Sequence, residues 1–148
     1  MHIYINNKFI SYNNYKAKCA VGKRGISIKK KEGDFITPKG TFKIKEIFYR
    51  KDRVQNLITR LKKTVIRKNM GWCDDPKSNL YNKLIKLPYN HSAEKLYIRE
   101  NIYDIILVID YNFSPIIKNK GSAIFLHIAR KNYRPTRGCV AVSKKNMR

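Results

Sequence analysis

The 148-residue sequence is poor in acidic residues and in cysteine, and it has no long apolar segment. Its three cysteines are too few, and odd in number, for a small domain built on disulfide bonds. The longest apolar run, residues 105–109, is far shorter than the roughly 20 residues of a membrane-spanning helix. The first ten residues alternate polar and apolar side chains, so they lack the basic start and apolar block of a cleavable signal peptide.

What the chain has in excess is positive charge, with 33 Lys and Arg against 10 Asp and Glu and a formal net charge of +23. Such a charge points first to an anionic partner such as nucleic acid. The 43% of hydrophobic and 11% of aromatic residues can form a core, which excludes disorder caused by weak hydrophobicity. No repeat or flexible linker divides the sequence, so we expect a single domain over residues 1–148.

The hydrophobic pattern predicts a mainly β fold. Strands are expected at residues 3–5, 16–21, 41–49, 103–110, 123–129 and 139–142, with Asn13 and Asn14 in a hairpin turn. Residues 37–40, Thr-Pro-Lys-Gly, have the composition of a turn. Apolar residues at three- and four-residue steps predict one helix over residues 53–66. Ser143 is placed to cap a second helix that the chain ends too early to complete.

A histidine and a cysteine near the end of the sequence are the candidates for catalysis. His127 lies near the end of an apolar strand, and Cys139 follows Gly138 at a loop-to-strand junction. A nucleophilic cysteine needs a base to take its proton, backbone N–H groups facing the developing oxyanion, and surroundings that favour the thiolate. Gly138 lets a substrate carbonyl approach the amides around Cys139 without a side chain in the way.

The distribution of charge is consistent with this chemistry. All ten acidic residues lie at or before Asp110, and residues 111–148 contain nine Lys and Arg. We therefore expect the local field to favour a thiolate at Cys139. The alternative is structural: His127 is a hydrogen-bonded strand residue, and Cys139 is a small buried hydrophobe. Composition and spacing do not choose between the two.

Two motifs stand out in the sequence. One is the segment Thr136-Arg137-Gly138-Cys139, with His127 upstream, and the other is residues 34–42, Asp-Phe-Ile-Thr-Pro-Lys-Gly-Thr-Phe. They resemble the nucleophile signature and the Asp-x-x-Thr-Pro-x-Gly-x-Phe stretch of the L,D-transpeptidase catalytic domain, a family with the YkuD-type fold. Residues 71–76 and 96–110 extend the resemblance, which covers most of the chain from about Ala17 onward.

The resemblance implies a mixed β-sandwich with one or two peripheral helices and a cysteine acyltransferase that acts on peptidoglycan stem peptides. Cys139 would attack the bond before a terminal D-Ala, and an amine of a second stem would resolve the thioester into a cross-link. His127 would be the general base and acid, and the backbone amides of Arg137, Gly138 and Cys139 would form the oxyanion hole. No cofactor or metal is implied, and we expect a monomer.

The sequence departs from the family pattern at two positions. Arg137 stands where the family usually has a second histidine, and Ala141 stands where it usually has Arg or Asn. Ala141 lacks the polar group that would bind the substrate carboxylate. Arg130, Arg134 or Arg137 would take over this role. The remaining candidates for substrate contact are Tyr133, Thr136 and Trp72, of which Trp72 either lines the cleft or packs in the core.

Several alternatives stay open at this level. An L,D-carboxypeptidase or a cross-link hydrolase would use the same site with water as the acceptor. A nucleic-acid-binding module would explain the charge, but Lys and Arg are spread along the chain without a recognition motif. An inactive wall-binding domain would explain the two departures.

Three further questions stay open: which group orients His127, where in the cell the protein acts, and whether the chain is complete. The group that orients His127 is a backbone carbonyl or a carboxylate such as Asp74 or Asp75. The family resemblance implies the cell envelope or periplasm, whereas a genuine start without another export route would leave the protein in the cytoplasm. The chain ends nine residues after Cys139, where the family normally continues, so truncation at the C-terminus and a complete chain both stay open.

Overall fold

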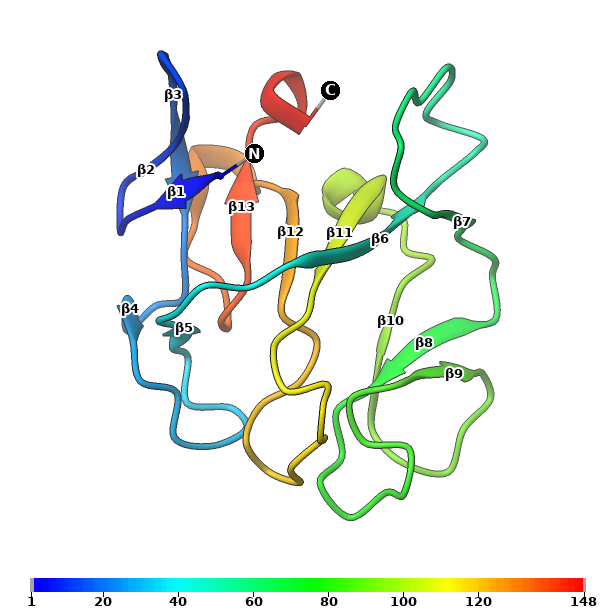
Figure 1. Cartoon of the computed structure of the whole chain (residues 1–148). Helices are drawn as coiled ribbons and strands as arrows, with labels where there is room; N and C mark the ends of the chain where they lie inside the picture. The colour runs from blue at the N-terminus through cyan, green and yellow to red at the C-terminus, as the bar shows by residue number, and fades with distance from the viewer. Residues whose placement is uncertain (1, 148) are drawn as a thin grey trace.

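The computed structural model describes residues 2–147 and places most strands in one large mixed sheet (Figure 1). Its order is β1-β2-β3-β13-β12-β11-β6-β7. The β12–β13 and β6–β7 pairs are parallel, and the other pairs are antiparallel. The strands are β1 (Tyr4–Ile5), β2 (Phe9–Tyr12), β3 (Tyr15–Ala20), β6 (Ile44–Tyr49), β7 (Lys63–Val65), β11 (Ile105–Ile109), β12 (Phe125–Ile128) and β13 (Val140–Val142).

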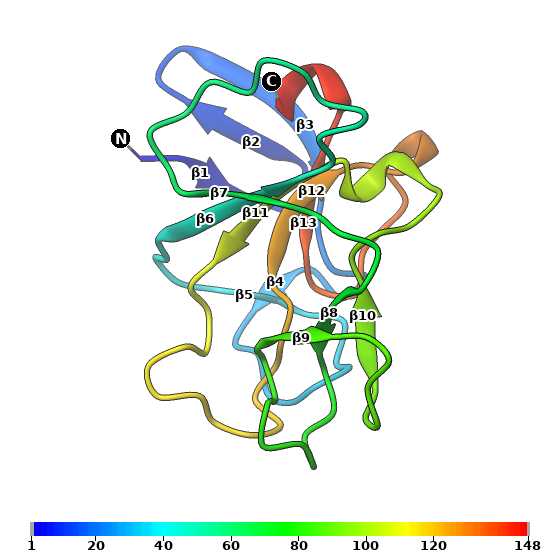
Figure 2. The ribbon, with the colours of Figure 1, turned by 90° about the vertical axis from the view of Figure 1, so that its right-hand side faces the viewer.

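Two smaller sheets complete the fold (Figure 2). One has the order β10-β8-β9, and the other pairs β4 with β5 in parallel. Their strands are β4 (Ile26–Ser27), β5 (Thr37–Pro38), β8 (Met70–Cys73), β9 (Leu84–Lys86) and β10 (Ala93–Lys95). Over residues 2–147 the only helical elements are short 3₁₀ turns, η1 (Asn101–Tyr103), η2 (Lys131–Tyr133) and η3 (Lys144–Met147). The mainly β fold class is confirmed.

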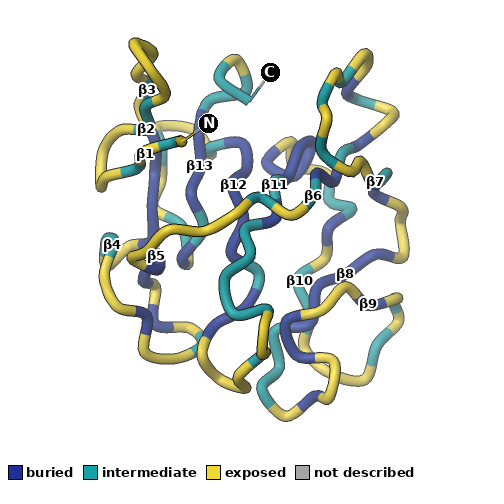
Figure 3. Tube along the Cα trace, viewed as in Figure 1, coloured by how far each residue is buried: buried dark blue, intermediate teal, exposed yellow. Residues whose placement is uncertain are grey.

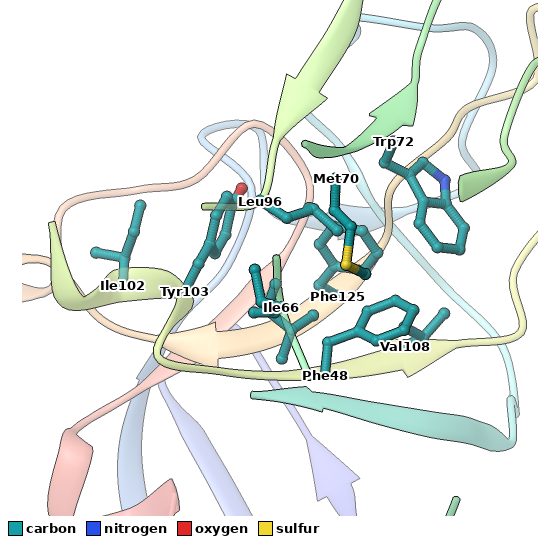
Figure 4. Packing of buried hydrophobic residues seen from close by; sticks show 10 residues of the cluster. Phe48, Ile66, Met70, Trp72, Leu96, Ile102, Tyr103, Val108 and Phe125 are labelled. Carbon is teal, nitrogen blue, oxygen red and sulfur yellow. The ribbon is translucent and has the colours of Figure 1, made fainter. Parts of the chain in front are cut away.

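The main core lies between the large sheet and β8. Val108 and Phe125 face each other across β11 and β12, because residues on one face of a strand recur every second position. They pack with Trp72 of β8, whose ring meets that of Phe125 edge to face at 5.4 Å between centroids (Figure 4). His127 is two residues beyond Phe125 on β12, so its side chain lies on this same face.

A second cluster covers the opposite face of the same strands. Leu126 of β12 packs with Val140 and Val142 of β13 and with Cys19 of β3. The middle strands of the sheet are therefore buried on both faces, as their continuous apolar sequences predict (Figure 3). This packing makes β12 and β13 a rigid base for the residues that follow them.

The helix predicted over residues 53–66 is wrong. Residues 54–62 form no regular element, and β7 (Lys63–Val65) pairs with β6 instead. Val54 is buried against the sheet, but Ile58 is 94% exposed, so the predicted apolar face does not exist. Asn56 has a φ of 54°, a left-handed conformation that interrupts a right-handed helix.

Other local expectations fare better. The predicted hairpin joins β2 to β3, with Asn13 in the left-handed conformation at a φ of 50°. Ser143 precedes η3 and accepts a hydrogen bond from the Asn146 amide through its hydroxyl at 3.3 Å, so the predicted cap serves a 3₁₀ turn. The expected turn at residues 37–40 begins instead with the two-residue strand β5 (Thr37–Pro38).

Candidate active site

The histidine and the cysteine are carried by two adjacent parallel strands. In the β12–β13 register Leu126 is opposite Val140 and His127 is opposite Ala141, and Cys139 directly precedes β13. Parallel neighbours need a crossover connection, which here runs through residues 129–139 and the turn η2. The ladder thus brings Cys139 to the strand that carries His127.

The imidazole of His127 is held from two sides. Its Nδ1 lies 2.9 Å from the carbonyl oxygen of Ile128, and the ring of Tyr103 packs edge to face on it at 5.3 Å between centroids. A neutral ring that donates from Nδ1 to this carbonyl keeps Nε2 unprotonated and able to accept a proton. Of the two orienting groups considered for His127, the structure therefore supplies the backbone carbonyl.

Burial controls the protonation of this histidine. His127 is only 6% exposed, and the burial lowers its pKa to about 4, with the nearby charge of Arg130 acting in the same direction. The imidazole is therefore neutral at pH 7, which is the form that a general base requires.

The thiol of Cys139 is hydrogen-bonded to the start of β12. It donates to the carbonyl oxygen of Ala123 at 3.1 Å and accepts from the amide of Phe125 at 3.4 Å. Burial of the sulfur raises the pKa of Cys139 to about 12. The Phe125 amide and Lys29 oppose this rise, and Glu94 adds to it.

The expected thiolate is therefore a wrong prediction for the resting state. The exposed arginines that follow β12 do not outweigh the desolvation of the sulfur, and among residues 2–147 the cation that lowers the pKa of Cys139 is Lys29, far away in the sequence. Because the pKa of the Cys139 thiol is about 12 and that of the His127 imidazolium is about 4, the proton stays on the sulfur at neutral pH.

Cys139 and His127 nevertheless open onto one cavity of about 520 Å³. Within residues 2–147 no hydrogen bond joins the thiol to the imidazole, because each is bonded to the backbone of β12 or its flanks.

Two threonines hold the loop that presents the cysteine. The hydroxyl of Thr37 donates to the Gly138 carbonyl at 2.8 Å and accepts from the Gly22 amide at 2.8 Å. The hydroxyl of Thr136 donates to the Cys139 carbonyl at 2.6 Å. Thr37 of the 34–42 motif thus fixes the backbone of the loop that carries Cys139, 101 residues away in the sequence.

Glycine is required at position 138 by the backbone and by its neighbours. Gly138 has a φ of 147°, and a Cβ there would lie 3.0 Å from the carbonyl oxygen of Ile36. Its own amide donates to the Thr136 hydroxyl at 3.1 Å. Of the three amides named for the oxyanion hole, Gly138 is thus engaged, which leaves Arg137 and Cys139 as candidates.

A comparison with protein-family models matches residues 1–148 to the L,D-transpeptidase catalytic domain, YkuD. The chain belongs to this family. Comparison with curated proteins and with solved structures found no match.

The three arginines predicted to contact substrate all reach the L,D-transpeptidase cavity. Arg130, Arg134 and Arg137 line it together with Thr136, and all three arginines are exposed. Ala141 also lines it, beside His127 in the strand register, so the position where the family usually has Arg or Asn contributes a small apolar wall. The three arginines of the cavity all lie on the crossover between β12 and β13.

Two other candidates lie elsewhere in the described chain. Trp72 is 3% exposed, and its indole donates to Asn82 at 2.9 Å, so it belongs to the core and not to the cavity wall. Tyr133 lies under the ammonium of Lys18, 4.9 Å from the ring centroid, and is not a wall residue of the cavity. Trp72 contacts the surroundings of the site through Phe125, against which it packs, and through Asn82, whose Oδ1 also accepts from the Ala123 amide.

Further charged residues complete the cavity of this L,D-transpeptidase domain, and of these the sequence singled out only Asp74. Lys29 lines it while paired with Asp34 at 2.6 Å, and both side chains are at most 3% exposed. Glu94 of β10 and Asp74 after β8 line the same cavity. No sequence signal marks Glu94, because its position depends on the pairing of β10 with β8.

Residues 2–147 contain neither a cluster of metal-ligating side chains nor a helix that could cross a membrane. No group of three or more His, Cys, Asp or Glu side chains there is arranged to hold a metal ion. Asp75 is instead paired with His91 at 2.9 Å. None of the described helices has the length and apolar character needed to cross a membrane.

Proposed function

We propose that this domain is an L,D-transpeptidase that cross-links peptidoglycan stem peptides through a thioester on Cys139. The observation that carries the proposal is the cavity shared by Cys139, His127 and three arginines in a chain of this family. The arrangement supplies a nucleophile, a base and cationic groups for an anionic peptide, which together are the parts of cysteine acyl transfer.

In the first half-reaction, Cys139 attacks the carbonyl of the bond that precedes the terminal D-Ala of a donor stem. Nε2 of His127 takes the thiol proton as the C–S bond forms, and the oxyanion faces the amides of Arg137 and Cys139. His127 then returns the proton to the leaving nitrogen, the C–N bond breaks, and D-Ala departs. The enzyme is left as a thioester with a neutral imidazole.

Substrate binding has to supply the activation that the resting site lacks. The raised pKa of Cys139 and the lowered pKa of His127 oppose proton transfer before the substrate binds. Attack concerted with proton transfer avoids a free thiolate, and Lys29 is the cation placed to offset negative charge at the sulfur. The terminal carboxylate of the donor would pair with the guanidinium groups of Arg130, Arg134 or Arg137.

Mass spectrometry of the reduced protein with disaccharide-tetrapeptide muropeptides tests the proposal. Cross-linked dimers and free D-Ala are expected from the wild type, together with a covalent adduct when a carbapenem replaces the donor. Cys139→Ala should form no adduct. The control Cys19→Ala alters a core cysteine outside the cavity and should keep the adduct.

The outcome also separates related activities. Trimmed tripeptides without dimers would identify an L,D-carboxypeptidase, in which water resolves the thioester. Absence of both products and of the adduct from folded wild-type protein would refute the cysteine acyltransferase assignment and favour an inactive wall-binding domain.

A further inference from the structure

The cavity that holds the three arginines also carries negative charge. Glu94 lies on β10 and Asp74 directly follows β8, so the pairing of these two strands fixes both positions. Both residues line the cavity that also contains the nucleophile and its base. A stem peptide in this cavity meets both cations and carboxylates.

Glu94 is connected to the base through one side chain. The hydroxyl of Tyr103 donates to Oε1 of Glu94 at 3.1 Å, and the ring of Tyr103 packs on His127. This contact uses one carboxylate oxygen. Burial, together with the charge of Asp74, holds the pKa of Glu94 above its ordinary value, against the opposing effects of Tyr103, Arg137 and Arg130.

Asp74 is a second carboxylate of this cavity. Its Oδ1 is enclosed and has no hydrogen-bond partner within the described part of the chain, residues 2–147. A buried carboxylate oxygen without a donor is costly, and the charge of Asp74 acts on Glu94. The third acidic residue of the cavity, Glu32, is already bonded by Tyr81 and Ser122.

The second half-reaction of an L,D-transpeptidase brings in a cationic group. The acceptor amine arrives as an ammonium and must be held, and must lose a proton, before it can attack. We propose that Glu94, assisted by Asp74, binds the ammonium of the acceptor stem peptide and takes its first proton. This inference rests on the proposed function and names the residues that favour an amine over water.

The step balances in atoms and charge. The ammonium gives one proton to the Glu94 carboxylate, and its lone pair then attacks the thioester carbonyl. The C–S bond breaks, the new C–N bond becomes the cross-link, and the remaining extra proton on nitrogen passes through His127 to the Cys139 sulfur. Glu94 later releases its proton to solvent, so the enzyme returns with a neutral thiol.

The test measures how the thioester partitions between amine and water. Wild type, Glu94→Gln and Glu100→Gln are incubated with the same tetrapeptide muropeptide, and dimers and tripeptides are quantified by mass spectrometry. Glu100 is exposed and outside the cavity, so its variant is a matched control for loss of one carboxylate. A tetrapeptide that is acetylated on its side-chain amine cannot act as an acceptor, so it measures the rate of thioester hydrolysis alone.

For Glu94→Gln the ratio of dimer to tripeptide should fall about 10- to 100-fold, as expected for loss of a hydrogen bond to a charged group. The apparent KM for the acceptor should rise, and Glu94→Asp should restore part of the ratio. An unchanged ratio would overturn the inference. Equal loss of both products would also overturn it, because it would assign Glu94 to the donor or to the structure.

Failure of the proposed function has a different signature. If the wild-type protein forms neither a thioester nor a carbapenem adduct, the proposed acyltransferase function is refuted, and the proposed acceptor site with it. If the wild-type protein forms the adduct but gives only tripeptides, the proposed acceptor site alone is refuted.

Discussion

Replacement of Thr37 by valine isolates the hydroxyl that holds the nucleophile loop. Valine keeps the shape of the side chain and removes a group that donates to Gly138 and accepts from Gly22. Thr37 is 4% exposed, and both glycines are buried, so water does not replace the lost partners in the native packing. The substitution leaves one carbonyl and one amide without a hydrogen bond.

The expected cost follows from those two groups. A buried polar group that loses its partner costs about 1–3 kcal/mol, and the added methyl group returns about 1 kcal/mol of burial. For the two groups together, the free energy of unfolding of Thr37→Val should therefore fall by about 1–5 kcal/mol, centred on about 3 kcal/mol. A domain with a stability of about 5–15 kcal/mol still folds after such a loss.

Urea unfolding followed by circular dichroism measures this change. With a dependence on urea of about 1–3 kcal/mol per molar, the midpoint should fall by about 1–2 M. Thr37→Ser keeps the hydroxyl and serves as the control, with a loss of about 1 kcal/mol for the methyl group. The carbapenem acylation rate of Thr37→Val should also fall, because the loop that carries Cys139 loses an anchor.

A Thr37→Val protein as stable as Thr37→Ser would refute the reasoning. A loss of stability with an unchanged acylation rate would also refute it, because the Thr37 hydroxyl would then have no effect on the position of Cys139.

Three further predictions concern stability and strain. Because burial lowers the pKa of His127 to about 4, the unfolded state, with a value of about 6.5, binds a proton first as the pH falls. The contribution of neutral His127 to the free energy of unfolding is complete above about pH 6.5. About 3 kcal/mol of this free energy should be lost between pH 7 and pH 4 in urea titrations of the wild type, but not in those of His127→Gln. Asp34→Asn should cost about 3–5 kcal/mol in the same assay because it strands the buried charge of Lys29, and Lys29→Met combined with Asp34→Asn should recover part of that loss. Gly138→Ala should lose about 1–3 kcal/mol and acylate more slowly, because its Cβ would meet the Ile36 carbonyl at 3.0 Å; full activity would contradict the strain.

The sequence predicts those features that depend on neighbouring residues. Apolar runs located the strands that became β11 and β12, and the Gly-Cys step before a strand located Cys139. Periodicity failed at residues 53–66, since apolar residues three and four apart also occur in a segment where Val54 packs inward and Ile58 does not. Only tertiary contacts distinguish that segment from an amphipathic helix.

The protonation of Cys139 could not be predicted from neighbouring residues for the same reason. The basic composition of residues 111–148 predicted a thiolate, yet burial of the sulfur decides the protonation of Cys139. The charges that act on it most directly, Glu94 and Lys29, come from β10 and from the loop after β4. A count of nearby charges in sequence cannot include groups brought together by folding.

The position of β13 has a consequence for the order in which the protein assembles. This strand joins β3 to β12, and its partner Ala20 is 121 positions before Ala141 in the chain. Contacts this distant in sequence carry a large loop-closure cost and tend to form late. The segment that orients the nucleophile is therefore also the one that closes the large sheet. Partly folded molecules in which this closure has not occurred would retain the strands of the core but could not acylate, so the appearance of catalytic competence should report the final step of folding.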